Sequence, residues 1–242
     1  MSEVKPKRAL WGNFPDVVIQ ATESAVKKHP CYTSAKTGDI DAALRLVQDC
    51  MPQEALDILR RRLVGKLPVV AAVQAVENMG VNVIPEVMAA YIAESLDLPL
   101  DADLAQINRV GHTGSSGFRR LATPALFDGH VERERDYLLV DDFVGQGGTL
   151  ANLRGYIEQH GGNVVLATVL TGKDYSAKLA LAAETLAGLR AKHGDDLENW
   201  WRQTYGYGFE LLTESEARYL IRTENADKVR AEIAAAVQGA HP

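Results

Sequence analysis

The chain has 242 residues, 46% of them hydrophobic and 24% charged, a composition that fits one large globular domain or a core with a smaller helical partner. Its net charge of −6 argues against a general nucleic-acid or membrane-surface binder. Two cysteines make neither a disulfide framework nor a metal site, and the sequence has no signal core and no apolar run of 18 residues, so we expect a cytoplasmic protein without membrane contact.

Residues 1–66 are predicted to be helical. The stretch GDIDAALRLVQDCM places Ile40, Leu44 and Val47 on one helix face. The stretch PQEALDILRRRLVG begins with a proline, which suits a first helical turn, and repeats apolar residues at helical spacing up to Leu63. We therefore expect an N-terminal helical segment.

The pattern changes after residue 66. Leu67–Val73 is a short, continuous apolar run, which is typical of a buried parallel strand. Gln74–Asn82 is polar and contains glycine, which indicates a loop. Apolar residues then recur on one helix face from Ile84 to Leu96, with Pro85 near the start. This region is therefore predicted to be a strand, a loop and a helix.

Two further segments follow before the next strong pattern. The stretch DLAQINRV, residues 103–110, is a candidate for the next strand. Residues 111–130 carry four glycines and little periodicity, which predicts a long loop. Loops of this length inside a compact region are usually functional or disordered.

A second strand and helix carry the main motif. Tyr137–Val140 predicts a buried strand, and Leu150, Leu153 and Ile157 line the face of a helix that ends at Gly161. Residues 163–170, NVVLATVL, predict another buried strand. Alternating strands and helices indicate an α/β fold with a mainly parallel sheet and flanking helices.

The tail, residues 173–242, is predicted to be helical, with Thr213 and Glu216 forming a capping box. An aromatic cluster between Trp200 and Phe209 is expected to pack these helices on the core rather than to stack on a ligand. We therefore divide the chain into an N-terminal helical segment (1–66), a core (67–172) and a C-terminal helical segment (173–242).

The stretch DDFVGQGGT, residues 141–149, indicates an anion-binding loop. It follows a strand of a parallel sheet, where ligands bind. Its glycines let the backbone approach a ligand closely, and successive N–H groups before a helix N-terminus favour a phosphate. A P-loop is excluded because Gly148 stands where its lysine belongs. A dinucleotide-binding loop is excluded because Leu150 stands where its third glycine belongs.

Two known families have motifs similar to this stretch. It resembles the first motif of DNA methyltransferases, but their Asn/Asp-Pro-Pro-aromatic motif is absent. It is more similar to the phosphoribosyl-pyrophosphate (PRPP) motif of the type I phosphoribosyltransferases, in which four hydrophobic residues, two acids and two apolar residues precede a small-x-Gly-Gly-Thr loop. Here that order runs from Tyr137 to Thr149. The likeness covers roughly residues 67–172.

The resemblance implies a phosphoribosyltransferase-like core that transfers phosphoribose from PRPP to an acceptor. Asp141 and Asp142 would contact the ribose hydroxyls. Gly145, Gln146, Gly147, Gly148 and Thr149 would bind the 5-phosphate. Mg²⁺ would be held through PRPP, without direct protein ligands, and the two carboxylates could reach it through water.

The resemblance also places the pyrophosphate beside the strand–loop–helix unit after residue 69 and makes Gly111–His130 a mobile lid. The residues with candidate roles on the pyrophosphate or in the lid are Glu77, Asn78, Arg109, His112, Arg119 and Arg120. The same residues also fit solvated or loop-capping positions.

The loop departs from the family at Gly145-Gln146, where many members have Thr-Thr or Ala-Thr. The 6-oxopurine enzymes have an aspartate at the position of Gly145, so a hypoxanthine- or guanine-type acceptor is not expected. Three readings remain: a phosphoribosyltransferase, a PRPP- or nucleotide-sensing regulator of the same fold, and, more distantly, an adenosylmethionine-dependent methyltransferase. The expected partners are PRPP and an unidentified small acceptor, without nucleic acid, and a homodimer is a candidate assembly.

Overall fold

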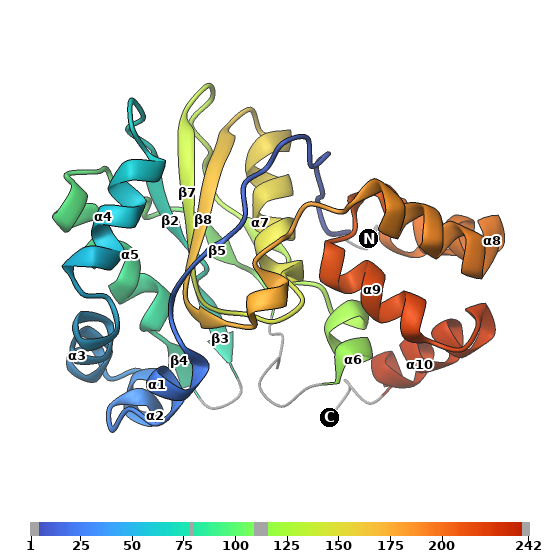
Figure 1. The fold of residues 1–242 in the computed structure, drawn as a ribbon, viewed down its shortest axis with the longest axis horizontal. Coiled ribbons are helices and arrows are strands. Elements are labelled where there is room, and N and C mark those ends of the chain that lie inside the picture. Colours follow the sequence, from blue (N-terminus) through green and yellow to red (C-terminus); the bar gives the residue numbers. More distant parts are fainter. Residues whose placement is uncertain (1–4, 78–79, 109–115, 239–242) are drawn as a thin grey trace.

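The computed structural model describes residues 5–77, 80–108 and 116–238, and a parallel sheet lies at its centre (Figure 1). The strand order within the described residues is β1-β8-β7-β2, and each neighbouring pair runs parallel. The strands are β1 (Val18–Ala21), β2 (Val69–Ala72), β7 (Asp136–Val144) and β8 (Asn163–Gly172). The predicted α/β fold with a mainly parallel sheet and flanking helices is confirmed.

Both faces of the sheet are covered, because neighbouring residues of each strand enter different hydrophobic clusters. Val70 and Leu138 pack with helices α3, α4 and α5 on one face. Val69 and Leu139 pack with α7 on the other. The bounds of these helices are α3 (Ile40–Cys50), α4 (Gln53–Arg62), α5 (Ile84–Leu96) and α7 (Gly148–Gln159). The predicted faces of α4, α5 and α7 are confirmed.

The C-terminal helices build a third hydrophobic cluster beside the sheet, together with α6 (Figure 1). Trp201 and Phe209 are fully buried at its centre, so these aromatic residues do pack. They build a cluster of the C-terminal helices, however, and not the predicted packing of these helices on the core, and Tyr207 lines the cavity described below. The capping box of Thr213 and Glu216 is also present. The helices of this part of the protein are α6 (Gly117–Ala122), α8 (Ala183–Tyr205), α9 (Glu214–Arg222) and α10 (Ala226–Gln238). Two 3₁₀ turns, at Asp174–Ser176 and Phe209–Leu211, lie in the same C-terminal part of the chain.

The prediction that residues 1–66 are helical throughout is wrong at β1. This strand forms the edge of the sheet, and Val18 pairs with Thr168 of β8. It is followed by the short helices α1 (Glu23–Lys27) and α2 (Tyr32–Lys36). The face predicted for α3 is also wrong in part, because Ile40 and Leu44 are 63% and 39% exposed.

Three segments between the main strands differ from their predictions. Within the described part of the stretch 103–110, Ala105–Gln106 forms a strand, β5, which pairs antiparallel with β6 (Phe127–Asp128) outside the main sheet. The predicted loop 74–82 contains an antiparallel hairpin of β3 (Ala75–Glu77) and β4 (Gly80–Asn82). Part of the predicted long loop 111–130 is the helix α6, whose apolar residues join the C-terminal cluster.

The N-terminal chain crosses α7 at Gly155. A Cβ built at Gly155 would overlap the backbone of Lys7 and Arg8, and it would lie 2.6 Å from the Arg8 amide nitrogen. Glycine is therefore required for this crossing. None of the helices in the described part of the chain combines the length and the apolar character needed to span a bilayer.

We expect Gly155→Ala to lower the free energy of unfolding by about 1–3 kcal/mol, because the backbone of residues 7 and 8 must move to admit the methyl group. This loss runs against the helix propensity of alanine, which exceeds that of glycine by about 1 kcal/mol. Gly188 of α8 provides the matched control, because its nearest neighbour would be Ile221 Cδ1 at 3.9 Å. Gly188→Ala should stabilise the protein in urea denaturation, and equal effects of the two substitutions would contradict the crossing.

Candidate functional site

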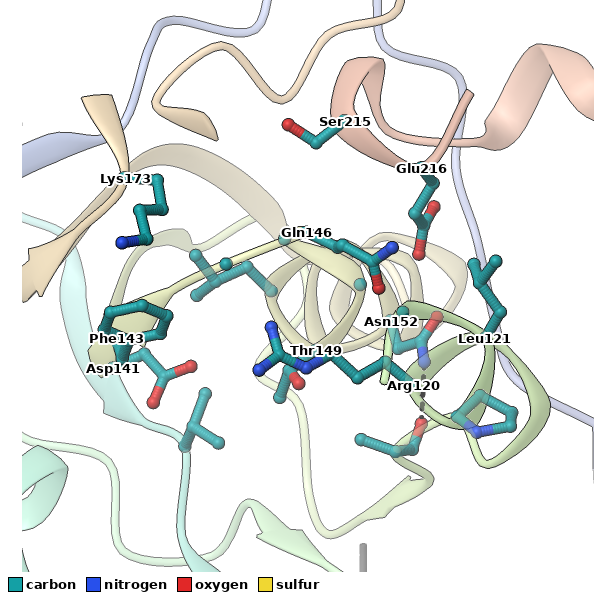
Figure 2. A pocket seen from close by; sticks show the side chains of 18 of the residues that line it. Arg120, Leu121, Asp141, Phe143, Gln146, Thr149, Asn152, Lys173, Ser215 and Glu216 are labelled. Atoms are coloured by element: carbon teal, nitrogen blue, oxygen red, sulfur yellow. Dashed lines mark hydrogen bonds between the residues drawn. The ribbon is translucent and has the colours of Figure 1, made fainter. Parts of the chain in front are cut away.

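A cavity of about 530 Å³ opens where β7 and β2 end at the carboxyl edge of the sheet. Its size falls within the range of ligand pockets. Its walls come from all three parts of the chain: the N-terminal helices, the loop between β7 and α7, and the helices α6 and α9. In the view of Figure 2, Asp141 lies on one side of the cavity, Glu216 on the other, and Arg120 between them.

The two adjacent carboxylates lie in the last part of β7. Asp141 is only 8% exposed, and its Oδ1 accepts a hydrogen bond from the backbone N–H of Asp142 at 2.8 Å. The Asp142 Oδ2 is 2.8 Å from the ammonium group of Lys36 in α2. Successive side chains of a strand point to opposite faces of the sheet, so one carboxylate is buried and the other is paired with a lysine.

Burial raises the pKa of Asp141 well above its ordinary value, and the neighbouring charge of Asp142 raises it further. The hydrogen bond from the Asp142 backbone N–H and the ammonium group of Lys36 oppose this shift without cancelling it. A buried carboxylate with a like charge beside it costs stability unless something compensates it. The ionised Asp141 carboxylate therefore destabilises the ligand-free protein. A ligand with hydroxyl donors, or a cation, would offset that cost.

The glycine-containing loop leads directly into α7. Gly147 is the N-cap of this helix and has φ +79°, a conformation that favours glycine. The carbonyl groups of Gly145 and Gln146 accept hydrogen bonds from the Ser176 and Thr213 hydroxyls, the latter at 2.6 Å. No backbone N–H of residues 145–149 donates a hydrogen bond to another described residue. The loop is thus anchored through its carbonyls, and its N–H groups remain available for an anion.

Arg120 of α6 reaches into this loop. A Cβ built at Gly145 would overlap the Arg120 guanidinium, so a side chain at position 145 would displace the arginine. Burial lowers the pKa of Arg120, which indicates that its cation has lost part of its hydration. A partly desolvated guanidinium beside loop N–H groups that have no acceptor among the described residues is suited to a phosphate.

A buried ion pair forms the wall over the first turn of α7. The Arg8 guanidinium donates to both carboxylate oxygens of Glu216, at 3.0 and 2.9 Å, and to Asn152 Oδ1 at 2.5 Å. A Cβ at Gly148 would lie 2.6 Å from Glu216 Oε1. The wall therefore contacts the loop directly, while Arg8 neutralises the carboxylate that would otherwise repel an anion.

The structure brings the acid pair, the glycine loop and one of the lid candidates into one place. Asp141, Asp142, the loop 145–149 and Arg120 line the same cavity, whereas Arg119 does not. Glu77 is the last residue of β3, and its backbone pairs with Gly80. The candidates Asn78, Arg109 and His112 lie outside the described residues. The binding roles of all these residues stay predictions.

The sequence did not identify the cavity residues that come from the two ends of the chain. Lys36 lies in the N-terminal segment, for which the sequence predicts only helix and no site residue. Glu23 of α1 is paired with Lys27 and Lys173, and these pairs lower its pKa. Two adjacent acids do signal that a cation is needed nearby, but no spacing in the sequence says which lysine supplies it.

The chain is similar to two curated proteins, and no family model matches it. It is 38% identical over 232 residues to protein TraN of Escherichia coli, a match that covers 96% of this chain and 52% of TraN. It is 35% identical over 156 residues to an uncharacterized protein of Haemophilus influenzae, covering 64% of this chain and 35% of that protein. The chain thus spans about half the length of TraN and a third of the other relative.

Solved structures with a similar arrangement include two phosphoribosyltransferases. Adenine phosphoribosyltransferase from Thermoanaerobacter pseudethanolicus is 18% identical, with a TM-score of 0.37 over 60% of this chain and 76% of that one. Orotate phosphoribosyltransferase from Aeropyrum pernix is 19% identical, with a TM-score of 0.34 over 55% of this chain and 67% of that one. Because these TM-scores are below 0.5, the function proposed below depends on the site itself.

We expect Asp141→Asn to stabilise the ligand-free protein at neutral pH by about 1 kcal/mol, the scale common when a costly functional group is removed. Folding raises the Asp141 pKa, so the wild type loses stability as the pH rises from the ordinary aspartate range through the raised value. The asparagine variant lacks this loss, and its advantage in Tm should therefore grow with pH.

Thermal denaturation at a series of pH values measures this difference. Asp16→Asn is the matched control, because Asp16 is exposed and its side chain has no hydrogen bond or ion pair with another described residue. A wild type that is more stable than Asp141→Asn at neutral pH would show that the Asp141 carboxylate is already compensated.

Proposed function

We propose that this chain binds PRPP in the cavity and transfers its 5-phosphoribosyl group to a nucleophilic acceptor, with release of pyrophosphate. The observation that carries the proposal is the order of groups around the cavity. Two adjacent carboxylates at the end of β7 stand three residues before a loop whose N–H groups have no acceptor among the described residues. A ligand with a diol beside a phosphate matches this order, and PRPP has both.

Asp141 and Asp142 would accept hydrogen bonds from the two ribose hydroxyls, because ionised carboxylates are acceptors only. Lys36 keeps Asp142 oriented by its ion pair at 2.8 Å. The cost of the buried Asp141 carboxylate would be offset when hydroxyl donors arrive. The same carboxylates would stabilise positive charge that develops on the ribose ring during the reaction.

The 5-phosphate would lie at the N-terminus of α7. The N–H groups of residues 145–149, the Thr149 hydroxyl and the helix dipole all favour an anion there. Arg120 would add a charge-assisted hydrogen bond, which is about twice as strong as a neutral one. In place of the small or hydroxylated residues common in this loop, the chain would use an arginine from α6 and a glycine that leaves room for it.

In the proposed reaction the acceptor's nucleophile forms a bond to the anomeric carbon of PRPP. The bond from that carbon to the pyrophosphate oxygen breaks, and pyrophosphate leaves with the electron pair. The acceptor loses its proton to solvent or base. The walls formed by α6 and α9 would limit the entry of water, which would otherwise compete as the nucleophile.

Magnesium is proposed as the cofactor, bound mainly through the oxygens of PRPP. The nearby carboxylates of Asp141 and Asp142 are oxygen donors of the kind that Mg²⁺ prefers, and they fit contact through water. The cation would supply charge neutralisation for the leaving pyrophosphate. A homodimer and the pyrophosphate roles of Glu77, Asn78, Arg109, His112 and Arg119 also stay proposals.

Calorimetric titration with PRPP and Mg²⁺ tests the proposal. The wild type should bind, Asp141→Asn and Asp142→Asn should each bind about 10- to 100-fold more weakly, and the double variant should lose binding, because each removes a charged acceptor. Adenosylmethionine serves as the control ligand and should not bind. A wild type that fails to bind PRPP would contradict the proposal.

The same proteins should be assayed for pyrophosphate release with a panel of bases and amines. Release that depends on one acceptor class identifies the transfer reaction. Tight binding of PRPP without release for any acceptor would contradict transfer and identify a PRPP-binding regulator.

Arg120→Ala should weaken PRPP binding about 10- to 100-fold, and Gly145→Thr should have a similar effect because it displaces the arginine. Arg61→Ala, which changes an exposed arginine of α4 outside the cavity, is the control and should leave the Kd unchanged. In the Arg120→Ala background, Gly145→Thr should cost nothing further, since the two changes act on one contact. Additive losses would show that Gly145 has a different purpose.

A further inference from the structure

The charges that line the cavity are unevenly distributed. Seven basic and four acidic side chains line it, although the whole chain has a net charge of −6. Four of the basic side chains already face carboxylates, in the pairs Lys36–Asp142, Lys27–Glu23, Lys173–Glu23 and Arg8–Glu216. Two of the remaining basic side chains, Arg218 and Arg222, come from α9.

Arg218 and Arg222 are one helical turn apart on α9 and both line the cavity. Residues at this spacing lie on the same helix face. Both side chains are exposed, and neither has a hydrogen bond or ion pair with another described residue. Two arginines whose Cβ atoms are about 5–6 Å apart thus flank the cavity.

The acidic residues of α9 itself are already engaged. Glu216 accepts both bonds from Arg8. Glu214 accepts from the Ala182 amide at 3.0 Å and from the Thr185 hydroxyl at 2.8 Å. Neither carboxylate is placed to neutralise the two arginines, so an anion from outside the protein would meet little competition.

The position of α9 is well fixed. Its N-terminus is held by the capping box of Thr213 and Glu216. The Tyr219 ring packs edge-on against Phe118 at 5.0 Å, and it lies so close to Gly117 that a Cβ there would overlap it. Because α6 and α9 are locked together through these rings, the two arginines are presented from a rigid wall next to Arg120.

Location separates this pair from the predicted pyrophosphate region. The helices α6 and α9 stand on the opposite side of the glycine loop from β2, β3 and β4 (Figure 1). The resemblance assigns pyrophosphate to the unit that follows β2, and the 5-phosphate to the loop itself. The N-terminal end of α9 contacts the glycine loop through Thr213 and Glu216, and the two arginines follow toward the other end of the helix. We therefore assign the arginine pair to the part of the cavity that neither phosphate of PRPP is proposed to fill.

We propose that Arg218 and Arg222 bind a carboxylate or phosphate of the acceptor, so that the acceptor of the phosphoribosyl group is an anion. This inference rests on the proposed function and adds its substrate class. A planar guanidinium binds such groups through two parallel hydrogen bonds, which gives orientation as well as charge. Orientation is what an acceptor needs if its nucleophile is to reach the anomeric carbon.

Matched acceptor pairs test the inference. Nicotinate and nicotinamide, and orotate and uracil, have the same rings with and without a carboxylate. Each is titrated into the protein saturated with PRPP and Mg²⁺, and pyrophosphate release is followed in parallel. In at least one pair the wild type should bind the anion at least 10-fold more tightly than its neutral partner.

Arg218→Ala and Arg222→Ala should each reduce that preference about 10-fold, while the Kd for PRPP stays within 2-fold of the wild type. Arg218→Lys should retain part of the preference. Arg61→Ala, an exposed arginine of α4 outside the cavity, is the matched control and should change nothing.

Three results would overturn the inference, and they differ from failure of the proposed function. Equal or undetectable binding of the anionic and neutral partners, in a protein that binds PRPP, removes the anionic acceptor alone. Arginine variants that weaken PRPP itself would place the pair in the PRPP site. A preference for the anion that survives in both variants would place its binding elsewhere. A wild type that does not bind PRPP contradicts the proposed function first.

Discussion

The buried ion pair between Arg8 and Glu216 joins the two ends of the chain at the first turn of α7, and the shape of the cavity depends on it. Arg8 reaches this point because the N-terminal chain crosses α7 at Gly155. Glu216 reaches it through the capping box of α9. Removing one partner of a buried ion pair typically costs about 3–5 kcal/mol, because the other charge is left uncompensated. This ion pair thus fixes the N-terminal turn of α9 against the glycine loop, and with it the position of the helix that carries Arg218 and Arg222.

The same site contains a cost that the fold does not compensate. Burial of Asp141 beside Asp142 disfavours the ionised carboxylate, and the hydrogen bond from the Asp142 backbone N–H and the charge of Lys36 oppose that effect without cancelling it. Proteins tolerate such a cost where a ligand offsets it, and perturbed carboxylates in a cavity are candidates for function on that ground. The rigid wall and the unfavourable acid pair are complementary: the first keeps the cavity open, and the second makes occupation by a suitable ligand favourable.

Local periodicity was sufficient to predict β2, β7, β8 and the helices α4, α5 and α7, because each has a long apolar pattern of its own. It missed β1, a four-residue strand whose place depends on pairing with β8, some 150 residues further along the chain. On α3 the pattern was ambiguous, and Ala43, Leu46 and Val47 are buried rather than Ile40 and Leu44. The positions of Lys36, Arg120 and Glu216 could not be predicted, since tertiary contacts are not encoded in sequence spacing. Gly145 indicated only that space was needed, not that Arg120 would occupy it.

Amide hydrogen exchange in the presence and absence of PRPP and Mg²⁺ tests the central claim most directly, because it reports on the loop N–H groups themselves. In the free protein these groups have no acceptor among the described residues and should exchange rapidly. Saturating PRPP should slow exchange at residues 145–149 more than in the strands of the sheet, which are protected already. Unchanged exchange in the loop at saturating PRPP, or protection confined to other segments, would contradict the account.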